Sequence, residues 1–199
     1  NLLTTAGANR ILTMDLHAGQ IQGFFDIPVD HLFAVGVFID YFSKSKANDL
    51  VVVSPDVGSI KMARAYAKRL SAGLAIIDKR RISPEKAEVM HILGEVENKD
   101  VIIADDLIAT GSSLVEAVQT LEKAKARSIV AAITHGVLSG PALEHIDKCK
   151  GLQKLLITDS IPLDTCKKHP KIEVLSVANL LGEAIKRIHN EESVSSLFD

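Results

Sequence analysis

Two adjacent carboxylates followed by small and hydroxylic residues form the stretch of this sequence best suited to binding chemistry. Asp105 and Asp106 close an apolar run, and the loop that follows, here called the hydroxyl loop, consists of Thr110, Gly111, Ser112 and Ser113. At the start of a helix, such a loop directs unpaired backbone N–H groups and hydroxyls at one anion, for example a phosphate. Carboxylates repel phosphate, but they accept hydrogen bonds from sugar hydroxyls or hold a divalent cation. The combination favours a sugar phosphate as ligand, the alternative being an acidic strand end followed by an ordinary Ser/Thr-capped helix.

His17 and Asp56 each follow a predicted strand and are candidate metal ligands. Together they could hold a Mg²⁺ ion that keeps most of its waters and bridges substrate phosphates. The simpler alternatives are a capping or core histidine at position 17 and an ordinary Ser-Pro-Asp turn at position 56. The other histidines have no companion at ligand spacing and are predicted to be structural or exposed: His31, His91, His135, His145, His169 and His189.

Lys79 and Arg81 lie in a charged, proline-containing segment, residues 79–86, that is predicted to be a loop. Cations on such a loop could close over a transferring phosphoryl group and stabilise the charge that spreads over its oxygens in the transition state. A basic loop that is merely solvated surface is the simpler alternative.

These candidates need a scaffold that brings strand ends together, and the hydrophobic pattern predicts one. Apolar runs predict strands at residues 10–16, 50–54, 74–78, 101–104, 128–135, 154–158 and 172–175, with a further extended stretch at 88–94. Helical spacing predicts helices at 35–43, 60–70, 112–126, from 141 onwards, and at 176–190. Alternating strands and helices favour an α/β fold with a mostly parallel sheet flanked by helices, in which the carboxyl ends of the strands share one edge.

The front of the chain is predicted to differ from the rest. Residues 1–7 resemble the end of a helix whose beginning is missing, and residues 24–33 pass through Pro28 as an extended turn. A change of composition near Ala34 makes that residue the predicted domain boundary.

Composition argues against several functional classes. The chain has 199 residues, 47% of them hydrophobic, a formal net charge of −2, 4% aromatic residues and no Trp, so it can bury a core but has no basic excess for binding nucleic acid. Cys149 and Cys166 show no disulfide or metal spacing, which favours a reducing compartment. No apolar run approaches the roughly 20 residues that span a bilayer. We therefore expect no nucleic-acid or membrane partner and a cytoplasmic protein.

A longer stretch resembles a known family. Residues 14–30, MDLHAGQIQGFFDIPVD, are similar to the signature of ribose-phosphate pyrophosphokinases (PRPP synthetases). The turn at 54–56, the basic segment at 78–81 and the segment at 105–113 follow in the family's order. The resemblance covers essentially the whole chain and implies that much of the family's N-terminal half is lacking.

The resemblance implies transfer of the β,γ-pyrophosphoryl group of Mg-ATP to the 1-hydroxyl of ribose 5-phosphate, giving AMP and 5-phosphoribosyl 1-diphosphate. It also implies Mg²⁺ as cofactor, homo-oligomers that are hexamers built from dimers, and the type I phosphoribosyltransferase-like fold used twice. Residues 1–34 would be the tail of an N-terminal domain of this kind, and residues 35–199 would form the C-terminal one.

The resemblance also implies a role for each candidate residue. His17 and Asp56 would bind Mg²⁺, and Lys79 with Arg81 would be the catalytic pair, with Arg81 also contacting substrate. Asp105 and Asp106 would meet the ribose hydroxyls, and the 5-phosphate would be held by Ala109, Thr110, Gly111, Ser112 and Ser113.

Two positions depart from the family's pattern, because Ala109 stands where an acid is usual and Met62 where Arg is frequent. Two alternative functions stay open: a non-catalytic subunit that regulates a complete enzyme, and a phosphoribosyltransferase that consumes the diphosphate.

Overall fold

The computed structural model describes residues 1–44, 49–80, 89–164 and 167–198, which form two sheets. In spatial order the larger sheet contains β5 (Val89–Leu93), β4 (Gly73–Arg80), β3 (Leu50–Ser54), β6 (Asp100–Ile108), β7 (Ser128–Gly136), β8 (Leu152–Thr158) and β9 (Ile172–Leu175). All its neighbouring strands are parallel except β4 and β5, which are antiparallel. The smaller sheet pairs β1 (Ile11–Met14) with β2 (Val29–Leu32), also in parallel.

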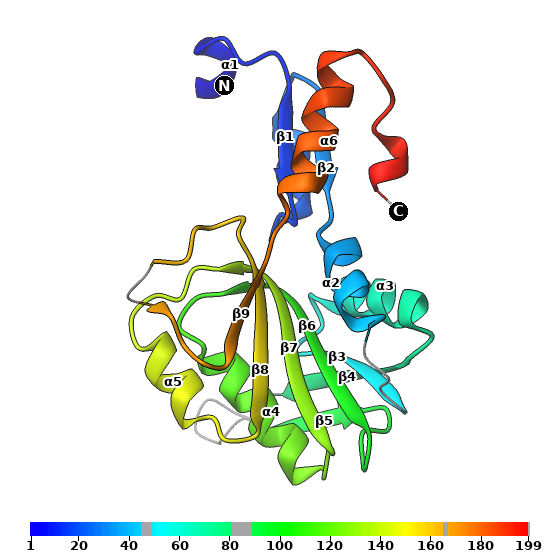
Figure 1. Ribbon diagram of the computed structural model, residues 1–199, viewed down its shortest axis with the longest axis vertical. Helices are drawn as coiled ribbons and strands as arrows, with labels where there is room; N and C mark the ends of the chain where they lie inside the picture. Colours follow the sequence, from blue (N-terminus) through cyan, green and yellow to red (C-terminus); the bar gives the residue numbers. More distant parts are fainter. Residues whose placement is uncertain (45–48, 81–88, 165–166, 199) are drawn as a thin grey trace.

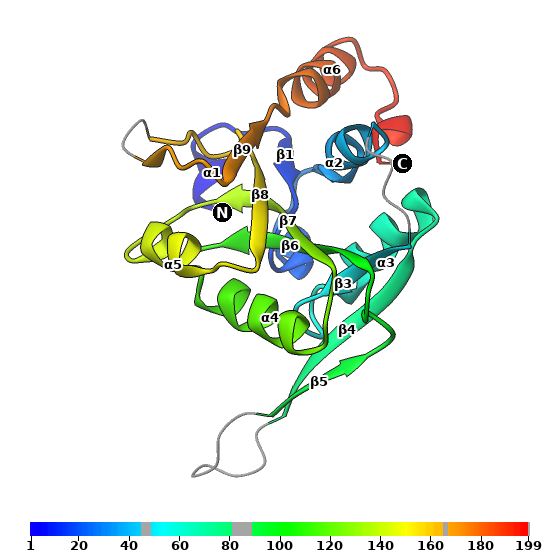
Figure 2. The same cartoon turned by 60° about the horizontal axis from the view of Figure 1, so that its bottom comes forward.

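Helices cover both faces of the larger sheet, as an all-apolar parallel strand requires. These helices are α2 (Val35–Phe42), α3 (Ile60–Leu70), α4 (Ser112–Lys123) and α5 (Ala142–Lys148). Side chains alternate along each strand, so Val51 and Val53 pack with α4 and α5, whereas Val52 packs with α2 and α3. Figures 1 and 2 show the two helical layers on opposite sides of the sheet.

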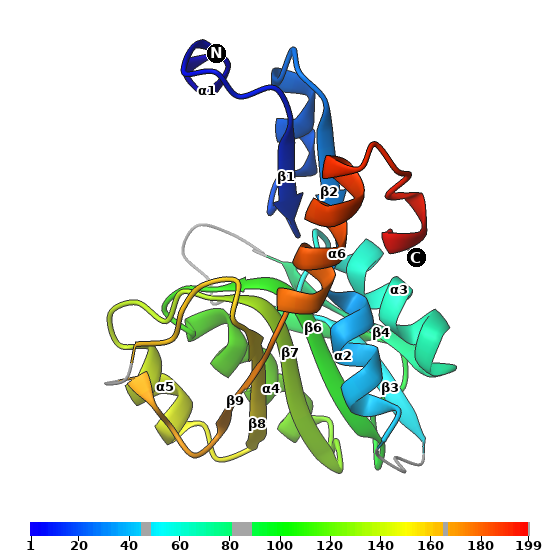
Figure 3. The ribbon, with the colours of Figure 1, turned by 45° about the horizontal axis from the view of Figure 1, so that its top comes forward.

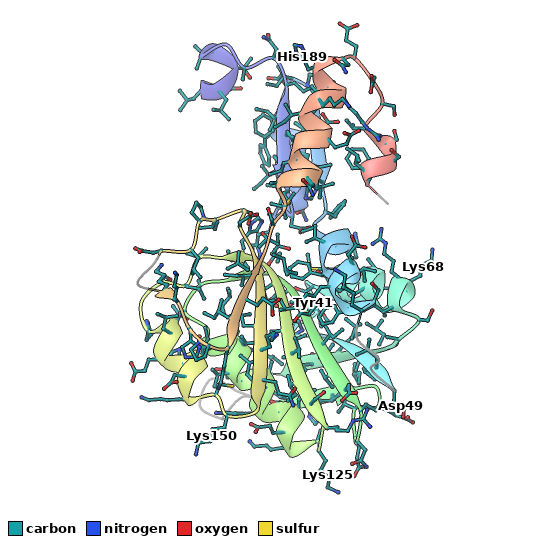
Figure 4. All side chains as sticks on the ribbon, in the orientation of Figure 1. Tyr41, Asp49, Lys68, Lys125, Lys150 and His189 are labelled. Atoms are coloured by element: carbon teal, nitrogen blue, oxygen red, sulfur yellow. The ribbon has the colours of Figure 1, made fainter. Side chains whose placement is uncertain are left out.

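A smaller lobe stands beyond the carboxyl ends of the large sheet. It contains α1 (Leu2–Thr5), β1, η1 (Gly19–Phe24), β2, α6 (Ala178–His189) and η3 (Ser195–Leu197). Figures 1 and 3 show α6 next to β1 and β2. Asp49 and Lys125, which precede β3 and β7, mark the opposite end of the sheet in Figure 4. The carboxyl edge of the sheet therefore faces the lobe that carries His17.

The predicted elements agree with the structure except in three places. Residues 24–33 are more than an extended turn, because they include β2. Lys79 was predicted in a loop but lies in β4, where it pairs with Met90 of β5. The two carboxylates lie inside β6, which continues to Ile108, rather than after its end. Within the described residues, no helix is long and apolar enough to cross a membrane.

Candidate functional site

Asp105 is a half-buried carboxylate on β6, held by two donors. Its Oδ1 accepts hydrogen bonds from the Oγ of Ser59 at 2.7 Å and from the backbone N–H of Asp106 at 3.0 Å. Loss of water around the carboxylate raises the pKa of Asp105 to about 6, and the neighbouring charge of Asp106 acts in the same direction. The side chain is therefore fixed in place and close to its protonation point near neutral pH.

His17 joins the small lobe to this carboxylate pair. It follows β1, and its Nδ1 lies 2.9 Å from the Oδ2 of Asp106. The hydrogen bond to Asp106, together with the charges of Asp106, Asp105 and Asp56, raises the pKa of His17. The His17 side chain is 82% exposed, so it is not a core histidine.

Asp56 lies in the turn between β3 and α3, beside the same group. Its Oδ1 accepts hydrogen bonds from the N–H groups of Gly58 at 2.8 Å and Ser59 at 3.0 Å, and its backbone oxygen accepts one from the Oγ of Ser54 at 2.7 Å. Ser59 thus donates its N–H to Asp56 and its hydroxyl to Asp105. Ser59 was not among the site residues predicted from the sequence, although a serine directly before a predicted helix is a recognisable N-terminal signal.

His17 and Asp56 suit an open Mg²⁺ site. The hydrogen bond from Nδ1 to Asp106 leaves the Nε2 of His17 for a ligand, and metal-binding histidines commonly use the other ring nitrogen in this way. Among the described residues no group of three or more His, Cys, Asp or Glu side chains could hold a metal ion. A cation that keeps several waters and is bound mainly by substrate phosphates needs only one or two protein ligands, so this donor set fits Mg²⁺.

The hydroxyl loop leads directly into α4 and leaves its backbone donors available. Gly111 adopts φ +78°, a conformation that glycine tolerates better than other residues, and it immediately precedes the first helical residue, Ser112. The hydroxyls of Thr110 and Ser112 lie 3.1 Å apart. The N-terminus of α4 has no side-chain cap at Gly111, so its first N–H groups can bind an anion.

Lys79 reaches the same helix from β4. Its Nζ donates to the Oε2 of Glu116, in the second turn of α4, at 2.9 Å. Arg81, the other predicted catalytic cation, lies outside the described residues.

A buried carboxylate supports the position of His17. Asp15 is only 3% exposed, and its Oδ2 accepts hydrogen bonds from the N–H of Ala34 at 3.0 Å and from the Oγ1 of Thr134 on β7 at 2.7 Å. Burial raises the pKa of Asp15. His135 adds a bond from its Nε2 to the Met14 and Asp15 carbonyls, each at 3.1 Å. The end of β1 is therefore fastened to the large sheet, and the only sequence signal for it is an acid at the end of an apolar run.

A family model described as the phosphoribosyl synthetase-associated domain matches residues 79–199. The chain belongs to the phosphoribosyl synthetase family. A ribose-phosphate pyrophosphokinase 1 from Listeria monocytogenes is 54% identical over 200 residues, which cover 100% of this chain and 63% of that protein. A ribose-phosphate pyrophosphokinase from Oceanobacillus iheyensis is 51% identical over 199 residues, covering 100% of this chain and 62% of that protein.

A solved structure of the phosphoribosyl synthetase family confirms the predicted fold class. The phosphoribosylpyrophosphate synthetase from Mycobacterium smegmatis superposes with a TM-score of 0.88 at 40% identity, covering 96% of this chain and 62% of that one. The mostly parallel, helix-flanked, phosphoribosyltransferase-like architecture is therefore that of the family. The chain spans about three-fifths of the length of these relatives.

Proposed function

We propose that this chain takes part in ribose-phosphate diphosphokinase activity, transferring the pyrophosphoryl group of Mg-ATP to the 1-hydroxyl of ribose 5-phosphate. The observation that supports it most directly is the 2.9 Å contact between His17 and Asp106, since it brings a candidate metal ligand to a candidate ribose-binding acid. Ser59 donates hydrogen bonds to both Asp105 and Asp56, so it links the second candidate ribose-binding acid to the other candidate metal ligand. The relatives' names point to the same reaction.

In the proposed reaction the ribose 1-hydroxyl gives up its proton to solvent and its oxygen bonds to the β-phosphorus of ATP. The bond from that phosphorus to the oxygen bridging to the α-phosphate breaks, releasing AMP. His17 and Asp56 would hold a Mg²⁺ ion, which would supply positive charge to the phosphates. The hydroxyl loop and Ala109 hold the 5-phosphate, and Asp105 and Asp106 accept hydrogen bonds from the ribose hydroxyls. The protein's contribution is alignment and charge stabilisation rather than covalent chemistry.

Lys79 and Arg81 are proposed to stabilise the transferring group. In the described conformation the Nζ of Lys79 is paired with Glu116, so a phosphate oxygen must replace that carboxylate before Lys79 can act. An ion pair this exposed contributes about 0–1 kcal/mol, so the exchange costs little.

We also propose the assembly and location that the family implies: a homo-oligomer built from dimers into hexamers, in the cytoplasm. The proposed division into residues 1–34 and 35–199 agrees with the separate sheet formed by β1 and β2, although α6, from the C-terminal part, lies beside that sheet.

The proposal is tested by incubating the protein with Mg-ATP and ribose 5-phosphate and following AMP and 5-phosphoribosyl 1-diphosphate by ³¹P NMR. Isothermal titration with ribose 5-phosphate measures binding independently of turnover. A His17→Ala variant should lose turnover but keep ribose 5-phosphate binding. If the protein neither binds ribose 5-phosphate nor forms product, the proposal is wrong.

A non-catalytic role in such an enzyme is the second candidate, because Ala109 stands in the proposed phosphate-binding segment at a position where an acid is usual in the family. It predicts that ribose 5-phosphate binds without turnover, and that adding the protein changes the activity of the full-length Listeria monocytogenes relative. Turnover by the protein alone would exclude it.

A further inference from the structure

Three consecutive carbonyl oxygens before α4 are held by donors from one segment, between β7 and the middle of α5. The bonds run from Leu138 N to Ile108 O (3.2 Å), from Ser139 N to Ala109 O (2.9 Å), and from His145 Nδ1 to Thr110 O (2.8 Å). A carbonyl oxygen can only accept, so the Nδ1 of His145 carries the proton and donates. We call the three donors the carbonyl clamp.

The carbonyl clamp determines which way the loop's amides point. In a trans peptide the N–H of one residue points opposite to the carbonyl of the residue before it. Holding the carbonyls of residues 108–110 toward α5 therefore turns the N–H groups of Ala109, Thr110 and Gly111 away from α5. Over the described part of the chain, the N–H groups of Thr110 and Gly111 meet no hydrogen-bond acceptor. They are left free on the side where an anion would approach the start of α4.

Helix α5 is itself firmly held, which makes His145 a fixed donor. Ala142 and Ile146 on its inner face are 0% exposed. At the other end of α5, the Nζ of Lys171 donates to the carbonyls of Ile146 at 3.1 Å and Cys149 at 2.7 Å. Figure 2 shows α5 beside the first turn of α4. The position of the His145 ring is therefore set by packing along the inner face of the helix and by hydrogen bonds at its C-terminal end.

We propose that His145 is a positioning residue that orders residues 109–111 for binding the phosphate of a sugar phosphate. This deepens the proposed function and rests on it for the identity of the ligand. The other two clamp donors are backbone N–H groups that almost any sequence supplies, whereas the third depends on the side chain at position 145. His145 acts through the Thr110 carbonyl and does not touch the ligand.

The test compares two substitutions at one position. His145→Asn keeps a donor, because the amide nitrogen of Asn takes nearly the place of Nδ1, whereas His145→Leu keeps bulk and removes the donor. Amide hydrogen exchange without ligand is read at Leu138 and Ser139, whose N–H groups are bonded to the held carbonyls of residues 108 and 109. It should speed up about threefold to tenfold there in His145→Leu, because loss of the third clamp bond loosens the segment that these amides hold. His145→Asn should exchange like wild type.

The binding measurement asks whether this ordering matters for the ligand. The dissociation constant for ribose 5-phosphate, and its KM where turnover is measurable, should rise about threefold to tenfold in His145→Leu. The KM for Mg-ATP and kcat should change less than about twofold. The 5-phosphate does not react, so its binding is weakened equally in the ground state and in the transition state. Lys148→Ala is the matched control: Lys148 lies on the same helix, and its side chain pairs with Glu144 instead of with a clamp carbonyl.

Each outcome bears on the clamp. Wild-type exchange at Leu138 and Ser139 in a folded His145→Leu protein would overturn the proposal, as would equal behaviour of the Leu and Asn variants. Should His145→Leu fail to fold, His145→Asn still decides, since faster exchange at Leu138 and Ser139 at an unchanged melting temperature would contradict a role for the donor. If wild-type protein does not bind ribose 5-phosphate, the proposed function is wrong. The exchange measurement, made without ligand, still tests whether the His145 donor orders the loop.

Discussion

Asp105 is a carboxylate that the fold largely removes from water, and its pKa of about 6 lies above the ordinary value of 3.8. Such a shift means that the folded state holds the proton more tightly than the unfolded chain does. The contribution of Asp105 to stability therefore falls as pH rises from about 3.8 to about 6, and above this range the ionised carboxylate carries its full cost. We interpret this cost as the consequence of placing a sugar-binding acid against Ser59 and Asp106.

Replacing Asp105 should remove that pH dependence. Urea unfolding of Asp105→Asn at pH 4, 5, 6 and 7.5 should show a free energy of unfolding that is higher than wild type by about 1–3 kcal/mol at pH 7.5, with the difference shrinking toward pH 4. Asp15 also makes the free energy of unfolding fall as pH rises, because its pKa is raised as well. Asp15 is present in both wild type and Asp105→Asn, so the difference between the two proteins reports Asp105 alone. Asp40→Asn, on the exposed side of α2, is the control and should run parallel to wild type. A constant difference at every pH would contradict the assignment.

Lys79 should matter for turnover far more than for folding. Under the proposed function, Lys79→Ala lowers kcat about 100-fold to 1,000-fold, the scale measured when a group that stabilises transition-state charge is removed. Its pair with Glu116 is partly exposed, at 27% and 47%, so the melting temperature should change by only a few degrees. Steady-state kinetics and thermal unfolding on the same samples check this, with Lys68→Ala on α3 as the exposed-lysine control. Comparable turnover losses in the two variants would refute the special role of Lys79.

At the scale of elements, the hydrophobic pattern predicted those strands and helices whose burial is decided locally. The strand Leu50–Ser54 is apolar throughout, and its bounds were predicted correctly because a strand covered on both faces needs no polar alternation. Helix α3 buries Ala63, Tyr66 and Ala67, the spacing from which it was predicted. The residues of β2 gave no such signal, because Asp30 and His31 in this four-residue strand interrupt the apolar pattern. Likewise, Lys79 continues β4 only because β5 pairs with it, and pairing is not a local property.

The junction between β5 and β4 should be sensitive to a single added methyl group. Gly94 follows β5 with φ +120°, and a Cβ there would lie 2.9 Å from the Leu74 carbonyl oxygen. Gly94→Ala should therefore lower the free energy of unfolding by about 2 kcal/mol or more. Gly182→Ala in α6 is the matched control with the opposite sign, because its Cβ meets nothing within 4 Å and alanine stabilises a helix interior by about 0.5–1 kcal/mol. Urea unfolding checks both, and equal effects of the two changes would show that Gly94 is not strained.

At the scale of the whole molecule, the sequence predicted which residues gather but not what holds them. His17, Asp56 and the carboxylate pair were expected at one edge because parallel strands align their carboxyl ends, and the contact between His17 and Asp106 agrees with this. Ser59, Asp15 and His145 were missed as parts of the site. Each works by touching a residue far away in the sequence: Asp105, Thr134 and Thr110 respectively. Such contacts exist only once the sheet has formed, and the spacing of apolar residues along the sequence does not predict them.

Asp15 connects the small lobe to the large sheet, so its loss should lower the stability of the whole molecule. In Asp15→Ala the N–H of Ala34 and the hydroxyl of Thr134 lose their buried acceptor, which should cost about 2–4 kcal/mol of unfolding free energy. Asp15→Asn keeps an acceptor oxygen and should lose less than half as much. The end of β1 would also loosen in Asp15→Ala, so amide exchange at residues 15–17 should rise before that of β6. If Asp15→Ala unfolds in one transition with wild-type stability, or if exchange near His17 is unchanged, then Asp15 does not fasten the two parts together.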